Sequence, residues 1–146
     1  MDLCFSEDCN QGVYNARDGV GDTPLHRAAE ENSVDLAKLL LAHSVDVDTT
    51  NEFDQTALHW AASQNSLDVA KVLIENSANV DNTDSWGETA LHTAAAHDSV
   101  DVAKLLIENY ANLNATAVSG SYKGLTPLQV AEIEGNQEMV ELLRNA

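Results

Sequence analysis

The residues in this sequence best suited to chemistry are its histidines, because imidazole can act as a general base or bind a metal ion near neutral pH. Three of the five, His26, His59 and His92, are spaced 33 residues apart. This spacing places each copy about one structural unit from the next, too far apart to share a metal ion or a substrate. His43 and His97 have no carboxylate or nucleophile at a recognisable spacing. We therefore expect no catalytic residue, no metal site and no cofactor.

The three histidines belong to a block of sequence that recurs with a nearly fixed period. TPLHRAA begins at Thr23, TALHWAA at Thr56, TALHTAA at Thr89 and TPLQVAE at Thr126, at spacings of 33, 33 and 37 residues. A second block follows each time: SVDLAKLLL from Ser33, SLDVAKVLI from Ser66, SVDVAKLLI from Ser99 and NQEMVELLR from Asn136. A period of about 20 to 50 residues indicates a repeat protein whose units stack on one another.

Each block predicts one helix. In the first block Thr caps a helix that carries Pro or Ala in its first turn and then paired alanines, which permit close helix contact. The second block predicts a longer amphipathic helix with an N-cap at Ser33, Ser66 or Ser99. Aspartate and lysine three residues apart predict the ion pairs Asp35–Lys38, Asp68–Lys71 and Asp101–Lys104. Apolar residues at i, i+3, i+4 predict one buried face: Leu36, Leu39, Leu40; Val69, Val72, Leu73; Val102, Leu105, Leu106.

On these blocks, and on the turn-forming residues between them, the sequence resembles the ankyrin repeat family and its TPLHxAA signature. The resemblance covers residues 18–146 and implies an all-α solenoid of stacked helix-turn-helix units joined by hairpin-like fingers. It also implies that His26, His59 and His92 form hydrogen bonds within and between repeats. The predicted units are a degenerate or truncated half repeat at 1–17, repeats at 18–50, 51–83 and 84–120, the last with an extended finger, and a capping repeat at 121–146.

The sequence departs from the family where glycine is usual, at the end of the second helix and at the turn between the helices. At the first position stand Ser44, Ser77 and Tyr110. We expect a positive φ at these three residues, at a cost of roughly 1 kcal/mol per site. At the second position stand Asn32, Asn65 and Asp98, with Gly135 in the fourth repeat. Asn and Asp tolerate the left-handed conformation better than most residues do.

Composition restricts the class of partner. Lys and Arg number 7 against 24 Asp and Glu, for a formal net charge of -17. Such a chain is repelled by a phosphate backbone, so we expect that it does not bind nucleic acid and that its protein partner is basic. We also expect the protein to be a monomer. The sequence lacks both an apolar run of about 18 residues and a basic N-terminal signal, so we expect no membrane insertion and a cytoplasmic or nuclear location. Cys4 and Cys9 match neither a zinc motif nor a disulfide framework.

In the ankyrin fold the fingers and inner helices line a groove where partners usually bind. Mapping by repeat position predicts the partner-binding residues Asp22, Glu30, Glu31, Glu52, Phe53, Gln55, Trp60, Gln64, Trp86, Glu88, His97 and Tyr122. Phe53, Trp86 and Tyr122 hold similar finger positions and predict a row of rings, which either anchor a partner or pack on the next finger. Trp60 does not recur, and it either fills space between repeats or reaches the groove.

These features predict a non-enzymatic protein–protein interaction module, such as a scaffold, adaptor or inhibitor, that binds a basic protein through an acidic groove and aromatic finger tips. Two alternatives have the same fold: a host-directed effector, or an inhibitor of a basic protein that mimics nucleic acid. A third alternative is a substrate for asparaginyl hydroxylation. In that case Asn15 and Asn114 match the finger asparagine that is modified in the family.

Overall fold

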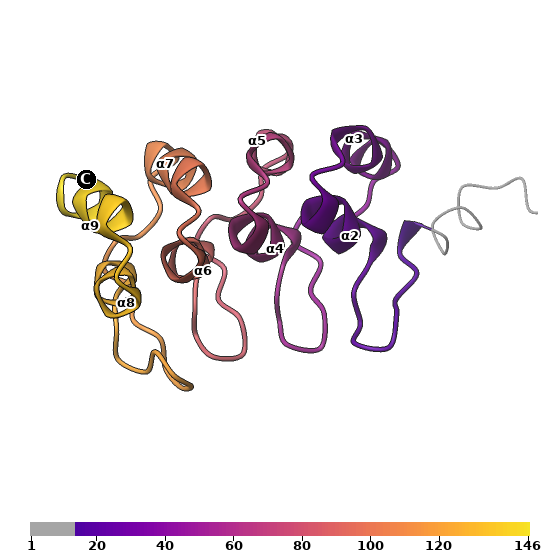
Figure 1. The fold of residues 1–146 in the computed structure, drawn as a ribbon. Helices are drawn as coiled ribbons and strands as arrows, with labels where there is room; N and C mark the ends of the chain where they lie inside the picture. Colours follow the sequence, from indigo (N-terminus) through magenta and orange to yellow (C-terminus); the bar gives the residue numbers. More distant parts are fainter. Residues whose placement is uncertain (1–13) are drawn as a thin grey trace, which may run out of the picture.

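The computed structural model describes residues 14–146, which form two layers of helices with fingers below them (Figure 1). The inner layer contains α2 (Pro24–Glu31), α4 (Ala57–Gln64), α6 (Ala90–His97) and α8 (Pro127–Glu134). The outer layer contains α3 (Val34–Ala42), α5 (Leu67–Glu75), α7 (Val100–Glu108) and α9 (Gln137–Arg144). The predicted all-α solenoid is confirmed. Cys4, Cys9 and most of the predicted half repeat lie outside the described residues.

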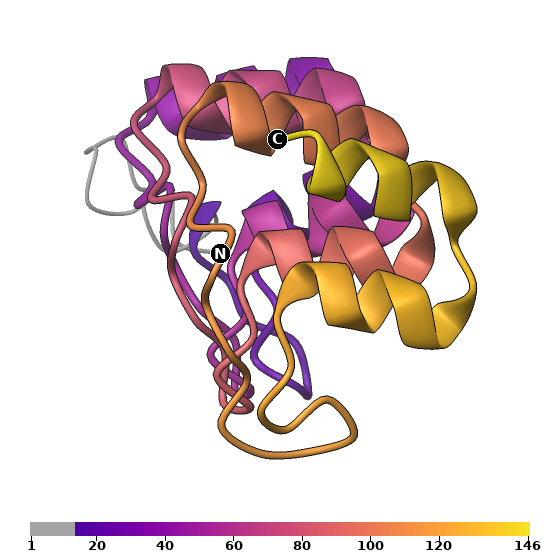
Figure 2. The same cartoon turned by 90° about the vertical axis from the view of Figure 1, so that its left-hand side faces the viewer.

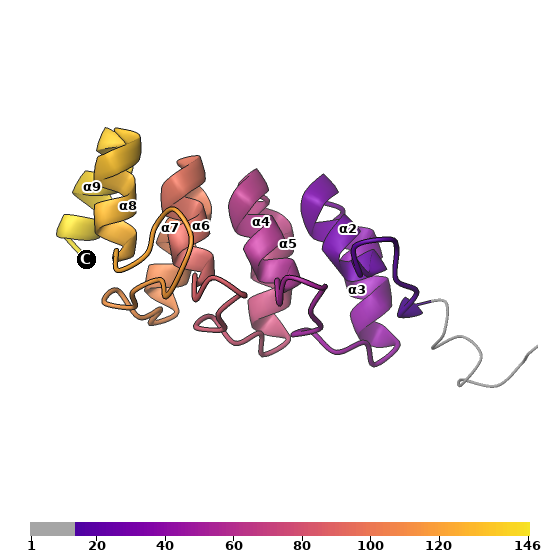
Figure 3. The same cartoon turned by 90° about the horizontal axis from the view of Figure 1, so that it is seen from below.

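The four helix pairs stand in a row, and all fingers project from the same side of the inner layer (Figures 2 and 3). Successive inner helices pack closely because the paired alanines between them are completely buried: Ala28, Ala29, Ala61, Ala62, Ala94 and Ala95. Such a unit cannot bury its faces alone, so stability comes from stacking neighbours. One predicted core residue is wrong, because Leu39 is 48% exposed on α3.

Local sequence explains where the inner helices begin and end. Each begins directly after a threonine, and the hydroxyl oxygens of Thr56, Thr89 and Thr126 accept the N–H of the residue three positions later at 3.3, 3.4 and 3.4 Å. Their last turns close on left-handed residues with φ between 53° and 73°, namely Asn32, Asn65, Asp98 and Gly135. After the outer helices, Ser44, Ser77 and Tyr110 have φ of 63°, 69° and 64°, as predicted.

The outer helices are capped differently from the prediction. Ser33, Ser66 and Ser99 occupy the N-cap positions, but their side chains form no capping hydrogen bond. For α5 and α7 the cap comes instead from the preceding repeat, and for α5 Asn32 Oδ1 accepts the Val69 N–H at 3.1 Å. Asn65 Oδ1 likewise accepts the Val102 N–H at 3.2 Å. An asparagine in the usual glycine position thus joins one repeat to the next.

The predicted ion pairs on the outer helices do not form. Within residues 14–146 the ion pairs are those of Arg27, which contacts Asp18 at 2.8 Å and Glu30 at 3.2 Å. The aspartate and lysine side chains expected to pair are exposed. Because water solvates both charges well there, a surface pair gains little over the separated ions.

Candidate protein-binding groove

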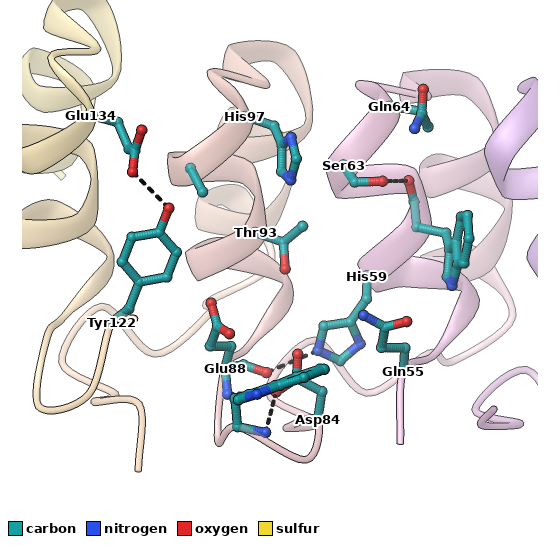
Figure 4. A pocket seen from close by; sticks show the side chains of 13 residues that line it. Gln55, His59, Ser63, Gln64, Asp84, Glu88, Thr93, His97, Tyr122 and Glu134 are labelled. Carbon is teal, nitrogen blue, oxygen red and sulfur yellow. Dashed lines mark hydrogen bonds between the residues drawn. The ribbon is translucent and has the colours of Figure 1, made fainter. Parts of the chain in front are cut away.

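A groove of about 640 Å³ lies in the angle between the inner helices and the fingers, across the second, third and fourth repeats (Figure 4). One wall comes from α4, the opposite wall from α8 and its finger, and α6 lies between them. The lining residues are Gln55, His59, Trp60, Ser63, Gln64, Asp84, Trp86, Glu88, Thr93, Ala96, His97, Tyr122 and Glu134. The groove is therefore built from side chains of three successive units.

Asp84 shapes the finger that forms the lower edge of this groove. Its carboxylate oxygen Oδ1 accepts the N–H groups of Trp86 and Glu88 at 2.9 and 3.0 Å, which closes a tight turn. Gly87, with φ of 76°, supplies the left-handed position of that turn. Asn51 closes the preceding finger in the same way, so the repeat pattern itself sets the finger's shape.

His59 holds this finger against α4. Its Nδ1 accepts the Thr56 N–H at 3.1 Å, so the proton is on Nε2, which donates to the carbonyl oxygen of Glu88 at 3.0 Å. Burial lowers the pKa of His59, which keeps the ring neutral. His26 and His92 form the equivalent pairs of hydrogen bonds. Each accepts the N–H of the threonine three residues earlier, and their Nε2 atoms donate to the carbonyl oxygens of Gln55 and Leu125. The three evenly spaced histidines therefore join repeats, as the family resemblance implies.

The groove is acidic. Its lining includes Asp84, Glu88 and Glu134, while none of its described lining residues is a lysine or arginine. The Glu88 side chain forms no hydrogen bond or ion pair within residues 14–146. Burial, together with the nearby Asp84 charge, raises the pKa of Glu88. A half-buried carboxylate without a counter-ion is unfavourable until a cation approaches it.

Tyr122 and Glu134 form the wall opposite α4 (Figure 4). The Tyr122 hydroxyl donates to Glu134 Oε1 at 2.7 Å. Burial and the carboxylates of Glu134 and Glu88 raise the pKa of Tyr122 to about 12, so the hydroxyl keeps its proton. Both carboxylates therefore lie near the same hydroxyl group. Among the described residues no ring contact joins Tyr122 to Phe53 or Trp86, so the predicted row of three rings does not extend to it.

The stacked aromatics are instead a pair, Phe53 and Trp86, with ring centroids 5.7 Å apart and planes 20° from parallel. Gly120 of the longer fourth finger also packs against Trp86, since a Cβ added there would meet Trp86 Cδ1 at 2.7 Å. Trp86 thus packs on its neighbouring fingers and also lines the groove. Trp60 combines both expected roles too, because it packs against the core, near His26, and lines the groove.

The structure brings some of the predicted partner-binding residues together and separates others. The groove is lined by Gln55, Trp60, Gln64, Trp86, Glu88, His97 and Tyr122. The other predicted residues lie outside its lining: Asp22, Glu30, Glu31, Glu52 and Phe53. Asp22 is also buried, contrary to its expected exposure, because Asn51 Nδ2 donates to its carboxylate at 2.8 Å. Glu30 pairs with Arg27, which neutralises part of the first repeat.

Six lining residues are not among the twelve partner-binding residues predicted above: His59, Ser63, Asp84, Thr93, Ala96 and Glu134. Thr93 holds the same repeat position as Trp60, so its place in the groove could have been predicted from its repeat position alone. His59 and Asp84 are mainly buried and support the finger, and their smaller exposed surface has no signal in the sequence.

Other predicted features fall elsewhere. Asn15 and Asn114 are both exposed, and Asn114 borders a second hollow of about 330 Å³ beside Leu113 and Leu128. Among residues 14–146 no three His, Asp or Glu side chains are grouped so that they could hold a metal ion. No helix in that part of the chain is both long enough and apolar enough to cross a membrane.

Comparison with known proteins identifies the family. The family model described as ankyrin repeats (3 copies) matches residues 3–84 and again residues 76–146. No curated protein matches the sequence. The two matched segments together cover nearly the whole chain, and the helix pairs, histidine links and fingers follow the same period. The chain belongs to the ankyrin repeat family.

Proposed function

We propose that this ankyrin repeat protein is a non-enzymatic binding module that takes a basic segment of a partner protein in the groove across its second to fourth repeats. Ankyrin repeats are generally protein–protein interaction modules, and the family is typically non-enzymatic. The observation that carries the proposal is the lining: three carboxylates and three aromatic rings, with no lysine or arginine among its described residues.

Charge and shape both favour a basic, extended occupant. The carboxylates of Asp84, Glu88 and Glu134 face one open groove, which concentrates negative potential where a partner would enter. The net charge of -17 attracts a basic partner over a longer range and increases the association rate at low salt. Trp60 and Trp86 provide the apolar surface that anchors side chains in protein interfaces.

Calorimetric titration with a basic, unstructured peptide tests this function. We expect binding to weaken steeply as salt increases, and to be lost when Glu88→Lys and Glu134→Lys are combined. Glu75→Lys is the matched control, because Glu75 is exposed at the end of the outer helix α5 and changes the net charge in the same direction. If the affinity does not change with salt or with the lysine substitutions, but binding is lost in Trp86→Ala, the site is apolar and the proposal is contradicted.

A further inference from the structure

The groove holds one charge that no described part of the protein balances. The Glu88 side chain is half-buried and unpaired, although the protein has basic residues elsewhere. Glu134 uses Oε1 to accept the Tyr122 hydroxyl, and no described residue donates to its Oε2. Together these two carboxylates have three oxygens that accept no hydrogen bond from a described residue. Both lie close enough to the Tyr122 hydroxyl to raise its pKa. A cation with several N–H donors would satisfy these oxygens.

Resting on the function proposed above, we propose that the groove binds an arginine side chain of the partner, with its guanidinium between Glu88 and Glu134 beside Tyr122. A guanidinium has five N–H donors in a planar fork, so it can donate to two carboxylates at once. A lysine ammonium is a compact point charge and matches this arrangement less well.

Two further properties of the lining favour arginine over lysine. Guanidinium is more weakly hydrated than ammonium, so moving it into a half-buried site costs less desolvation. It also stacks on aromatic faces, and the groove contains Trp60, Trp86 and Tyr122 within the same lining. The volume of about 640 Å³ exceeds that of one side chain, which leaves room for the flanking peptide backbone.

Three capped glycine pentapeptides that differ only at the central residue test this inference. The central residue is arginine, lysine or citrulline, since citrulline keeps the shape of arginine but has no charge. Binding is followed through the indole N–H signals of the isotope-labelled protein, because Trp60 and Trp86 are its two tryptophans and both line the groove. We expect the arginine peptide to bind at least about threefold more tightly than the lysine peptide, and citrulline to abolish binding.

Glu88→Gln is the decisive variant, and we expect it to weaken arginine binding about tenfold. It keeps the backbone carbonyl that His59 contacts, so the finger retains its support. Glu134→Gln changes an exposed residue and should weaken binding similarly, which guards against a folding defect in the first variant. Glu75→Gln, on the outer layer, should leave affinity unchanged.

The possible failures are distinguishable. Equal affinity for the arginine and lysine peptides, or unchanged arginine affinity in Glu88→Gln and Glu134→Gln, would overturn the assignment to arginine while the basic-partner function stands. Binding of neither charged peptide would overturn both proposals. Binding of the citrulline peptide as tightly as the arginine peptide would show that charge is irrelevant to the groove.

Discussion

The ring of His59 is fully engaged by the fold, with Nδ1 bonded to Thr56 and Nε2 to the backbone of the next finger. Gln129 holds the equivalent position in the fourth repeat, and comparison with it shows the contribution of the histidine Nε2 atom. Its Oε1 accepts the Thr126 N–H at 2.9 Å, which reproduces the cap within one repeat. The described structure shows no bond from Gln129 to another finger. Histidine is therefore used where a repeat must be joined to its successor.

This engagement predicts a pH-dependent stability. Burial lowers the pKa of His26, His59 and His92 below their usual 6.5, so the unfolded chain takes up protons first as the pH falls. The stability that these neutral rings contribute is complete above pH 6.5 and is lost as the pH falls toward their native pKa values. We expect the urea midpoint to decrease from about pH 7 to about pH 5. A midpoint that stays constant or increases over that range would contradict the prediction.

His59→Gln is the control, since it retains the cap but removes one titrating ring. Its midpoint should depend less steeply on pH than that of the wild-type protein. Glu88 acts in the opposite direction, because burial raises its pKa above the usual 4.5 and its protonation favours the native state. Protonation of Glu88 therefore opposes the effect of the three histidines, and the comparison with His59→Gln isolates the histidine contribution.

The left-handed residues predict that two similar glycine substitutions have different effects. Ser77 has φ of 69° and its side chain forms no hydrogen bond in the described structure, so Ser77→Gly should stabilise the protein by about 1 kcal/mol. Asn65 has φ of 53°, but its Oδ1 caps α7. In Asn65→Gly the lost cap offsets the relieved strain, so we expect no stabilisation. Urea unfolding measures both, and an equal gain in the two variants would show that the cap contributes nothing.

At the scale of elements, the fingers are coupled to one another as well as to the helices. Ser85 N–H donates to the Phe53 carbonyl at 2.9 Å, and Val118 N–H donates to the Trp86 carbonyl at 2.8 Å. The finger before α8 contains four additional residues, and they lie between Ala117 and Leu125. The Ala117 N–H donates to the Leu125 carbonyl at 3.2 Å, as the Asp84 N–H donates to the Glu88 carbonyl in the preceding finger. The insertion therefore lengthens the tip and increases the spacing to 37 residues, but it keeps the hydrogen bond at the base of the finger and brings Gly120 against Trp86.

Two glycines in that extension separate packing from backbone strain. Gly120 and Gly124 have φ of 77° and 78°, so alanine at either position is strained to a similar degree. A Cβ at Gly120 would overlap the Trp86 ring, whereas a Cβ at Gly124 would meet no atom within 4 Å. We expect Gly120→Ala to destabilise the protein about 1 kcal/mol more than Gly124→Ala and to change tryptophan fluorescence. Equal effects of the two substitutions would mean that the tip does not pack on Trp86.

The elements could be predicted from the sequence because their signals are local. Threonine caps, apolar periodicity and the 33-residue period place every helix pair of residues 14–146. What could not be predicted depends on a side chain from another repeat. Asn32 replaces the serine cap of α5 in the following repeat, and Asn51 donates a hydrogen bond to the buried Asp22. Trp60 lines the groove together with the smaller Thr93, which holds the equivalent position in the third repeat.

At the scale of the whole molecule, the acidic excess extends over both helix layers and the fingers. Three of the seven basic residues, Lys38, Lys71 and Lys104, are exposed on the outer helices, whereas the groove carboxylates lie on the inner side. In the first repeat Arg27 forms ion pairs with Asp18 and Glu30, whereas the later repeats have no ion pair in the described structure. The net negative charge would therefore attract a basic partner to the molecule as a whole, and the groove carboxylates would select the contact site.

The same excess of negative charge should limit the stability of the folded chain. A net charge of -17 on a compact chain of 146 residues produces self-repulsion that unfolding relieves, because the charges move apart. Screening weakens this repulsion over distances longer than the Debye length, so we expect Tm at pH 7 to rise by several degrees in about 0.5 M NaCl. Calorimetry in equal concentrations of NaCl and KCl separates screening, which the two salts share, from binding of a particular ion. A Tm that is unchanged or lower in both salts would show that charge repulsion does not limit the stability of the folded chain.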